Sequence, residues 1–388
     1  MKAIGIIPLR KGSKGIPGKN KKKLLGRPLY QWVLGEAIQS DLDDVYVFTD
    51  DDDLIEKINS IYTWTNKVKT YKRSEESATD TASTEFGMLE LAQALEYQFD
   101  VFCLLQATSP LTNSEDINKT LNRVKSGESD SALTAVSTKR FIWSEEGKSL
   151  NYDYLSRPRR QDFNGMLIEN GAVYAISKSV YQETNNRLGG KIGVVEMEED
   201  TLIEIDEPSD WITIEQILKT RIAKVKSQFL KIKALVLDVD GVFTPGTVHV
   251  SGDGELAKTF SLRDGMGLEI ARESGLEIIV MTSESSAIVD QRMKKLAIKH
   301  YYKWAKDKYA LVNHLCKELA ISRQEIAYIG DDINDLANLL SVAWGMAPVD
   351  AVEEVKGNVD IVLHAKGGDK AIREGVDFIL KINSRFSK

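Results

Sequence analysis

Short β-branched runs alternate with longer amphipathic stretches along this chain, and the alternation occurs twice. In the first half the predicted strands are 3–9, 44–50 and 100–110, and the predicted helices are 28–41, 53–62 and 83–99. Strands that alternate with helices predict a parallel sheet with helices on both faces. A chain of 388 residues is long enough for two such sheets. We therefore expect an α/β protein of two doubly wound domains.

The second half repeats the pattern and adds one different element. Its predicted strands are 234–240, 276–282 and 325–329, and its predicted helices are 264–274, 285–296, 306–320, 333–341 and 369–382. Residues 246–261 read instead as two short strands around SGDG, which predicts a β-hairpin. One long helix is predicted over 210–233. We place the boundary within about 220–232 and divide the chain into domains 1–227 and 228–388.

Charge and composition exclude several classes of partner. The net charge of −7 provides no basic excess for nucleic acid. No apolar run approaches the length of a membrane span, and the N-terminus lacks the pattern of a signal peptide. Cys103 and Cys316 are far apart and have no metal-binding spacing, as expected in a reducing compartment. We expect a cytoplasmic protein with neither nucleic acid nor membrane as a partner.

A basic, glycine-rich turn, RKGSKGIPGKN (10–20), follows the first predicted strand. Glycines allow a ligand to approach the backbone closely, and exposed N–H groups with nearby cations can hold a polyphosphate. The turn is neither a Walker A sequence nor a dinucleotide-binding fingerprint. Composition alone slightly favours the alternative of a flexible basic loop.

Further blocks carry a resemblance to a known family. They are DTAST (80–84), LLQATSPL (104–111), RPRRQD (157–162), ENGAVY (169–174), GGKIG (189–193) and IEIDEPSDW (203–211). With the basic turn, these blocks resemble the acylneuraminate cytidylyltransferases, including the longer vertebrate form with a second domain. The resemblance implies a Rossmann-like nucleotidyltransferase sheet. It also implies transfer of CMP from CTP to a sugar acid, with loss of pyrophosphate.

The resemblance also implies residue roles. The residues that would bind CTP are Arg10, Ser13, Lys14, Lys19, Asn20, Arg73 and Gln106, of which Arg10 and Lys19 would also act in catalysis. The residues that would bind the acidic sugar are Arg157, Arg159, Arg160, Gln161 and Asn170. Glu204 and Asp206 would bind Mg²⁺ from alternate positions of one strand. The family commonly has aspartate in place of Glu204 and arginine in place of Thr112.

A second candidate site begins at LVLDVDGVFT (235–244), an apolar run that leads into Asp238 and Asp240. A carboxylate can attack a phosphate ester if a metal shields the two anions and another acid protonates the leaving oxygen. The remaining groups such a site needs follow in order: Thr282, Lys308, Asp331, Asp332 and Asp335. The alternative is that each aspartate only caps a helix or a turn.

These elements resemble the haloacid dehalogenase-type phosphatases, and the hairpin and KGGDKAIRE (366–374) resemble the branch that acts on phosphorylated ulosonic acids. The resemblance implies a second Rossmann-like sheet with a small β-hairpin flap. Asp238 would be the nucleophile and Asp240 the acid and base, while Thr282 and Lys308 would hold the phosphoryl group. The residues that would bind Mg²⁺ are Asp238, Asp240 through its carbonyl, and Asp331, with Asp335 supporting Lys308 or the metal.

The sequence TSES (282–285) bears on the length of the sugar. It resembles nine-carbon ulosonate phosphatases rather than octulosonate phosphatases, and this implies sugar contacts from Glu284, Arg292 and Lys295. The alternative is that Arg292 and Lys295 are solvated charges on a helix. Relatives without a cap domain form tetramers in which a neighbour's hairpin closes the site, so a homotetramer is expected.

The leading hypothesis is a bifunctional enzyme that uses Mg²⁺ in both domains. The C-terminal domain would dephosphorylate a nonulosonate 9-phosphate, and the N-terminal domain would couple the free nonulosonic acid to CMP. A first alternative makes the C-terminal domain a non-catalytic tetramerisation module. A second alternative, a regulator that binds sugar nucleotides, has no DNA-binding helix pair or basic face to support it.

Overall fold

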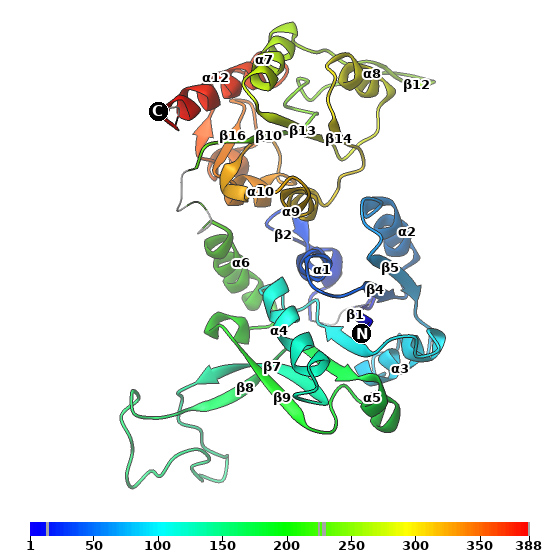
Figure 1. The fold of residues 1–388 in the computed structure, drawn as a ribbon, viewed down its shortest axis with the longest axis vertical. Helices are drawn as coiled ribbons and strands as arrows, with labels where there is room; N and C mark the ends of the chain where they lie inside the picture. The colour runs from blue at the N-terminus through cyan, green and yellow to red at the C-terminus, as the bar shows by residue number, and fades with distance from the viewer. Residues whose placement is uncertain (13–14, 224–225, 227–229, 387–388) are drawn as a thin grey trace. The chain divides into compact units, whose positions relative to one another are not determined.

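The computed structural model of the protein describes residues 1–12, 15–223, 226 and 230–386. It contains two compact units, shown as a ribbon in Figure 1. The N-terminal unit comprises Met1–Lys22 and Pro28–Ile214, and the C-terminal unit comprises Lys23–Arg27 and Glu215–Lys388. The boundary expected between 227 and 228 lies outside the described residues.

A seven-stranded sheet forms the centre of the N-terminal unit. Its order is β5-β4-β1-β6-β8-β7-β9. The strands are β1 (Ala3–Leu9), β4 (Asp44–Thr49), β5 (Val68–Lys72), β6 (Val101–Leu105), β7 (Ser131–Thr138), β8 (Met166–Ser177) and β9 (Ile192–Met197). Strand β1 pairs in parallel with β4 and β6, whereas β8 runs antiparallel to β6 and β7. The sheet is therefore mixed, with the expected parallel strands around β1.

Helices cover both faces of this sheet. They are α1 (Leu29–Gln39), α2 (Asp52–Ile61), α3 (Thr84–Ala94), α4 (Ser114–Lys125) and α5 (Lys178–Thr184), with 3-10 turns at Lys19–Lys21 and Glu199–Leu202. Helix α6 (Pro208–Ala223) begins in this unit and continues into the C-terminal unit from Glu215. Successive side chains of β1 join different apolar clusters: Ile7 packs in one and Ile6 in the other. Both faces of β1 are thus buried, which explains its continuous apolar sequence.

Two predicted helices are wrong at their C-terminal ends. The helix expected over 83–99 stops at Ala94, because Glu96 and Tyr97 adopt left-handed backbone conformations with φ of 50° and 53°. The helix expected over 210–233 does not reach its predicted end, since residues 230–233 are not helical. Of the intervening residues, 224–225 and 227–229 lie outside the described part of the chain.

The C-terminal unit has a six-stranded sheet in the order β14-β13-β10-β15-β16-β17, and all its neighbouring strands are parallel. The strands are β10 (Ala234–Leu237), β13 (Glu277–Met281), β14 (His300–Tyr302), β15 (Ile326–Ile329), β16 (Trp344–Ala347) and β17 (Ile361–Val362). Strand β10 is shorter than the predicted 234–240, so Asp238 and Asp240 lie beyond its end.

Helices also cover both faces of the second sheet. They are α7 (Leu262–Glu273), α8 (Ala287–Lys295), α9 (Lys308–Glu318), α10 (Leu336–Ser341), α11 (Glu353–Lys356) and α12 (Ala371–Asn383), with 3-10 turns at Arg323–Glu325 and Ser384–Phe386. Helices α7 and α12 lie on one face, and α9 and α10 lie on the other (Figure 1). The five helices predicted from the sequence are confirmed, with shifts of a few residues at their ends.

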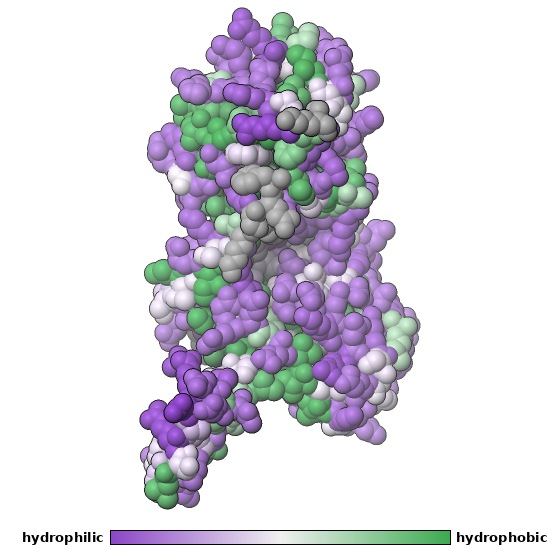
Figure 2. Space-filling view, turned by 60° about the vertical axis from the view of Figure 1, so that its left-hand side comes forward, coloured by the Kyte–Doolittle hydropathy of each residue, from purple (hydrophilic) through white to green (hydrophobic). Residues whose placement is uncertain are grey.

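Two small hairpins complete the C-terminal unit. Strands β11 (His249–Ser251) and β12 (Gly254–Ala257) form the predicted antiparallel hairpin. Strands β2 (Lys23–Leu24) and β3 (Arg27–Pro28) form the other two-stranded sheet. The face of the molecule in Figure 2 is mostly hydrophilic, with hydrophobic side chains in small groups. Within the described residues, every helix is too short or too polar to cross a membrane.

Candidate functional site

A pocket of about 240 Å³ lies beside β1 in the N-terminal unit. Arg10, Arg73 and Gln106 line it, so three of the residues assigned to CTP meet at one place. Arg10 lies just beyond β1 and donates hydrogen bonds to the carbonyl of Thr79 (3.0 Å) and to the carboxylate of Asp80 (2.8 Å). The pocket therefore presents guanidinium groups of the kind that bind phosphates.

Arg73 lines this pocket and is buried. Its guanidinium lies 5.1 Å from the centre of the Phe48 ring, and it donates to the backbone carbonyl of Ser77. Burial lowers the pKa of Arg73, and the positive charge of Arg10 contributes to the same shift, although Asp50 opposes it. Two cations that line one pocket favour an anionic ligand in it.

The basic turn packs against the segment that precedes α6. Lys19 Nζ lies 2.7 Å from the carbonyl oxygen of Ile205 and 3.1 Å from the carboxylate of Asp206. A Cβ atom at Gly15 would lie 2.2 Å from the carbonyl oxygen of Asp206, so this close approach requires glycine. Asn20 donates to the carbonyl of Arg10 (3.1 Å). Ser13 and Lys14, also assigned to CTP, lie outside the described residues.

Glu204 and Asp206 do not lie on a strand, so that prediction is wrong. They belong to an irregular connection between the 3-10 turn at Glu199–Leu202 and α6. The Glu204 carboxylate lies over Gly171, where φ is 69° and a Cβ atom would be 1.7 Å from its oxygen. Burial raises the pKa of Glu204, and the negative charge of Asp206 raises it further. The Asp206 carboxylate is bonded to Lys19, whereas that of Glu204 lies over Gly171, so the two carboxylates have different partners.

The residues assigned to the acidic sugar are not at this pocket. Arg157, Arg159, Arg160 and Gln161 are exposed on an arm, residues 139–165, between β7 and β8. Figure 1 shows this arm extending from the sheet away from β1. The Arg157 guanidinium stacks 4.5 Å from the Phe141 ring centre, on the same arm. The buried Asn170 amide is bonded to Thr134 (2.7 Å) and Thr201 (3.2 Å), which joins β8 to its neighbours.

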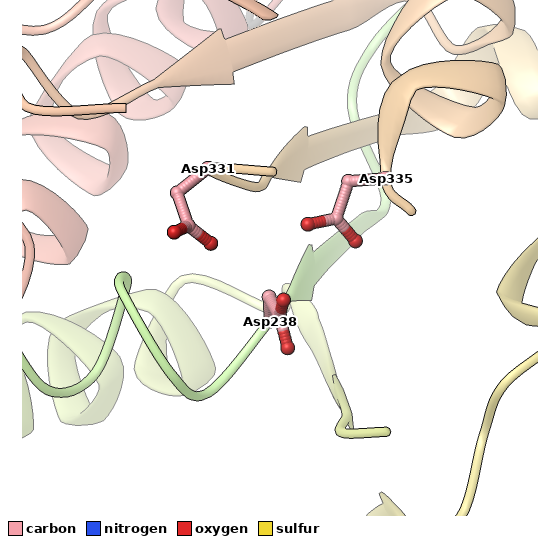
Figure 3. Close-up of side chains that lie close together, drawn as sticks. All are labelled: Asp238, Asp331 and Asp335. Carbon is pink, nitrogen blue, oxygen red and sulfur yellow. The ribbon is translucent and has the colours of Figure 1, made fainter. Parts of the chain in front are cut away.

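In the C-terminal unit, the ends of three adjacent strands carry the second site. Asp238 follows β10, Thr282 follows β13 and Asp331 comes shortly after β15. Because β10 pairs in parallel with both other strands, their carboxyl ends meet at one edge of the sheet. Figure 3 shows Asp238, Asp331 and Asp335 close together, and one carboxylate oxygen from each lies within 4.8 Å of the others. The expected cluster is present.

Lys308, the first residue of α9, lies inside this cluster. Its side chain is only 1% exposed, and Nζ lies 2.7 Å from Asp238 Oδ2 and 2.8 Å from Asp335 Oδ1. The Tyr328 hydroxyl also donates to Asp335 (2.6 Å). Burial alone would lower the pKa of Lys308, but Asp238 and Asp335 outweigh it and raise the pKa. Lys308 is therefore a fixed cation beside Asp238.

The carboxylates retain unused binding capacity for a cation. Asp331 Oδ1 and Asp335 Oδ2 are buried and have no hydrogen-bond partner among the described residues. Burial, followed by repulsion from Asp335, raises the pKa of Asp331 to about 7, and the same causes raise the pKa of Asp238. A Cβ atom at Gly241 would lie 1.9 Å from Asp331 Oδ2, so glycine there admits the carboxylate. These oxygens fit Mg²⁺.

Asp240 has a partner that sequence reasoning missed. Lys258, just after β12, lies 2.7 Å from Asp240 Oδ1, and its side chain is 4% exposed. The Thr244 hydroxyl is 3.4 Å from the same oxygen. No spacing or composition marks Lys258 in the sequence, because its role depends on how the hairpin folds back.

The three residues assigned to sugar recognition lie on two segments, Glu284 just after β13 and both Arg292 and Lys295 on α8. Glu284 is exposed, and its N–H donates to the Thr282 hydroxyl (3.2 Å). Arg292 donates to the carbonyl of Ser261 (3.1 Å), with its guanidinium 5.6 Å from the Phe260 ring centre. Lys295 is exposed on α8. The structure thus places Glu284 beside a phosphate-binding candidate and Arg292 against the start of α7.

The fold and the two groups of side chains define a chain with a nucleotidyltransferase-type unit and a phosphatase-type unit. Residues 4–233 match the family model described as cytidylyltransferase, and residues 302–369 match the model described as haloacid dehalogenase-like hydrolase. N-acylneuraminate cytidylyltransferase of Oncorhynchus mykiss is 31% identical over 98% of this chain and 89% of its own length. The chain belongs to the cytidylyltransferase family, and its C-terminal region belongs to the haloacid dehalogenase-like hydrolases.

Relatives of the C-terminal region alone are also found. The 3-deoxy-D-manno-octulosonate 8-phosphate phosphatase of Salmonella typhi is 35% identical over 38% of this chain and 79% of its own length. The crystal structure of the Moraxella catarrhalis phosphatase of the same name, in complex with a magnesium ion, phosphate and the octulosonate, is 32% identical. It covers 43% of this chain and 95% of that chain, with a TM-score of 0.39.

Proposed function

We propose that this chain is a bifunctional enzyme of nonulosonate activation. The C-terminal unit removes the phosphate of a nonulosonate 9-phosphate, of the ketodeoxynonulosonate or N-acetylneuraminate type. The N-terminal unit then couples the free sugar acid to CMP from CTP and releases pyrophosphate. The observation that carries this proposal is the intact group of Asp238, Lys308, Asp331 and Asp335 in a chain that aligns with cytidylyltransferases over nearly its full length.

In the phosphatase reaction, a carboxylate oxygen of Asp238 attacks phosphorus and the bond to the sugar oxygen breaks. Asp240 gives its proton to that oxygen, and Lys308 with Thr282 holds the phosphoryl oxygens. Asp240 then takes a proton from water, which attacks the aspartyl-phosphate and releases phosphate. Lys308 supports this role because its ammonium is already fixed 2.7 Å from the nucleophile.

Mg²⁺ is the cofactor proposed for both units. In the C-terminal unit Asp238, Asp331 and the carbonyl of Asp240 would hold it, with Asp335 supporting Lys308. In the N-terminal unit Glu204 and Asp206 would hold it. When bound, the ion supplies positive charge that offsets the repulsion between phosphate oxygens and carboxylates. The buried, unpartnered oxygens of Asp331 and Asp335 support the first of these assignments.

In the cytidylyltransferase reaction, the anomeric hydroxyl of the sugar acid attacks the α-phosphorus of CTP and loses its proton to solvent. The bond from that phosphorus to the bridging oxygen breaks, and pyrophosphate leaves. Arg10 and Lys19 counter the charge that accumulates on the phosphoryl oxygens. Arg73 and Gln106 lie along the nucleotide in the same pocket. Guanidinium groups are suitable bidentate partners for the carboxylate of the sugar acid. Arg157, Arg159 and Arg160 lie on the arm and not at this pocket (Figure 1), so they can take this role only if the arm meets the bound sugar.

The test is a substrate panel with the full chain and Mg²⁺. Nonulosonate 9-phosphates and octulosonate 8-phosphate are offered separately, and phosphate release is measured. CTP is then supplied with each free sugar acid, and pyrophosphate and CMP-sugar are measured. We expect phosphate release and CMP-sugar formation with the nine-carbon compounds and weaker reaction with the eight-carbon compounds.

Two outcomes would contradict the proposal. If no ulosonate phosphate is hydrolysed while CMP-sugar forms, the C-terminal unit is a non-catalytic tetramerisation module. If only the octulosonate compounds react, the class of substrate is wrong. Glu284, beside Thr282, is the residue on which the proposed preference for nine carbons depends most.

Lys258→Met is expected to lower the phosphatase kcat about 10- to 100-fold, because loss of the ammonium frees the Asp240 side chain from its position. The rate is measured with p-nitrophenyl phosphate and Mg²⁺. Lys299→Met, which removes an exposed lysine from the same unit, is the matched control and should retain the wild-type rate. Equal phosphatase rates for the two variants would show that Lys258 has no role in the phosphatase reaction.

The hairpin β11–β12 is proposed to hold a homotetramer together. Val250 and Leu256 are each 69% exposed on it, and a second copy of the hairpin would cover them. The double variant Val250→Glu, Leu256→Glu should dissociate the tetramer, as measured by light scattering during size-exclusion chromatography. A wild-type chain that elutes as a monomer, or a double variant that remains tetrameric, would contradict this assignment.

A further inference from the structure

A short segment from the first part of the sequence belongs to the C-terminal unit. Residues Lys23–Arg27 lie within the stretch 4–233 that matches the cytidylyltransferase family. Their contacts, however, group them with Glu215–Lys388. The segment contains β2 and the start of β3, and its Leu24 and Leu25 are buried. It is therefore built into the phosphatase unit.

Arg27 binds the residue that precedes Lys308. Its Nε lies 3.0 Å from Asp307 Oδ1 and its Nη2 lies 3.1 Å from Asp307 Oδ2, a bidentate pair. The two side chains are 4% and 0% exposed. The guanidinium also lies 4.6 Å from the centre of the Tyr309 ring. A planar fork fixes the orientation of a carboxylate in a way that a lysine ammonium cannot.

Asp307 connects this pair to the catalytic lysine. It caps α9 by accepting a hydrogen bond from the N–H of Ala310 (3.3 Å), and Lys308 is the next residue. The position of Lys308 Nζ between Asp238 and Asp335 therefore depends on where the first turn of α9 is held. Arg323 also holds this turn, since its Nη2 donates to the carbonyl of Tyr309 (2.9 Å) and its guanidinium lies 4.0 Å from the centre of the Tyr309 ring. The Arg27 fork adds a bidentate hold on the carboxylate of Asp307 itself.

Gly26 contacts the other wall of the same site. Its φ is 80°, and a Cβ atom there would lie 1.8 Å from the carbonyl oxygen of Ile333. Ile333 lies in the turn between Asp331 and Asp335, the two carboxylates with unpartnered oxygens. Gly26 and Arg27 thus contact the two segments that carry Lys308, Asp331 and Asp335.

We propose that Arg27 is a positioning residue of the phosphatase site, which holds Lys308 in place through Asp307. The inference rests on the proposed phosphatase activity. It makes the segment Lys23–Arg27 a functional part of that site although the segment lies more than two hundred residues before Asp238 in the sequence. Gly26 serves the same site by allowing the turn at Ile333 to approach.

The test uses the full chain with p-nitrophenyl phosphate and Mg²⁺. Arg27→Met should lower kcat about 10- to 100-fold, with a smaller effect on KM, because the lysine contact strengthens as charge develops on the phosphoryl group. Arg27→Lys keeps a positive charge beside Asp307 but lacks the fork, so kcat per folded molecule should still fall below the wild-type value. Lys23→Met removes an exposed cation from the same hairpin and should behave as wild type.

A second measurement does not depend on activity. Amide hydrogen exchange should become faster in Arg27→Met over residues 308–318 and 331–336, and it should be unchanged over α12. If Arg27→Met leaves Asp307 buried without its partner and unfolds the unit, the double variant Arg27→Met, Asp307→Asn removes that charge while an amide still caps α9. The double variant should fold, and its kcat for p-nitrophenyl phosphate should remain below that of the wild type.

The outcomes separate the two proposals. A wild-type chain that hydrolyses no phosphate ester would contradict the proposed function, and hydrogen exchange would still test the contact. An active wild type whose Arg27→Met variant keeps both its kcat and its exchange rates would overturn the inference. A loss of activity that follows only the loss of folded protein, with kcat per folded molecule unchanged, would also overturn it.

Discussion

Asp238→Asn is expected to reduce phosphate release by at least about 1,000-fold, the scale of loss when a covalent nucleophile is removed. The amide has the shape of the carboxylate but cannot form the acyl phosphate. Cytidylyltransferase activity should remain, because Arg10, Lys19 and Arg73 belong to the other unit. Release of phosphate and formation of CMP-sugar are measured on the same preparation.

The stability of this variant gives an independent check. Burial and the nearby Asp335 raise the pKa of Asp238, so the ionised carboxylate lowers the stability of the metal-free protein at neutral pH. The neutral amide of Asp238→Asn removes this loss of stability, and Lys308 keeps Asp335 as an ion-pair partner. We expect an unfolding temperature equal to or above that of the wild type. An active Asp238→Asn variant would show that another group is the nucleophile.

Lys19→Met is expected to lower kcat/KM for CTP about 100- to 1,000-fold, because it removes a cation placed where charge develops. Its ammonium is held between the carbonyl of Ile205 and the carboxylate of Asp206, so it is oriented before any ligand binds. Pyrophosphate release at varied CTP concentrations measures the effect. Phosphatase activity should not change.

Lys11→Met is the matched control for this variant. Lys11 lies in the same basic turn and is exposed, so its loss tests general attraction of CTP by positive charge. We expect a change of a few-fold that disappears at high salt. If Lys19→Met and Lys11→Met lose the same small amount of activity, Lys19 has no specific role.

The residues of the phosphatase site that the sequence predicted could be found for the same reason. Asp238, Thr282 and Asp331 follow apolar runs, and parallel strands bring such positions to one edge of the sheet. Lys308 was found because it opens an amphipathic helix in the expected order. These residues were assigned without knowing the order of the strands in the sheet. The structure shows that β10 lies between β13 and β15, so the three strand ends are neighbours.

The residues that the sequence did not predict act through packing between distant segments. Lys258 reaches Asp240 only because a hairpin folds back, and Arg27 reaches Asp307 across 280 positions. The resemblance implied alternate positions of one strand for Glu204 and Asp206, but neither residue lies on a strand, and local sequence cannot tell whether a partner strand is available. Contacts that such irregular segments make with distant parts of the chain cannot be predicted from the residues nearby in the sequence.

The membership of Lys23–Arg27 in the C-terminal unit has a consequence for how the two enzymes can be separated. A single cut in the chain cannot produce two complete units, because any fragment that begins near Glu215 lacks this segment. An inactive C-terminal fragment would therefore say nothing about the intact phosphatase.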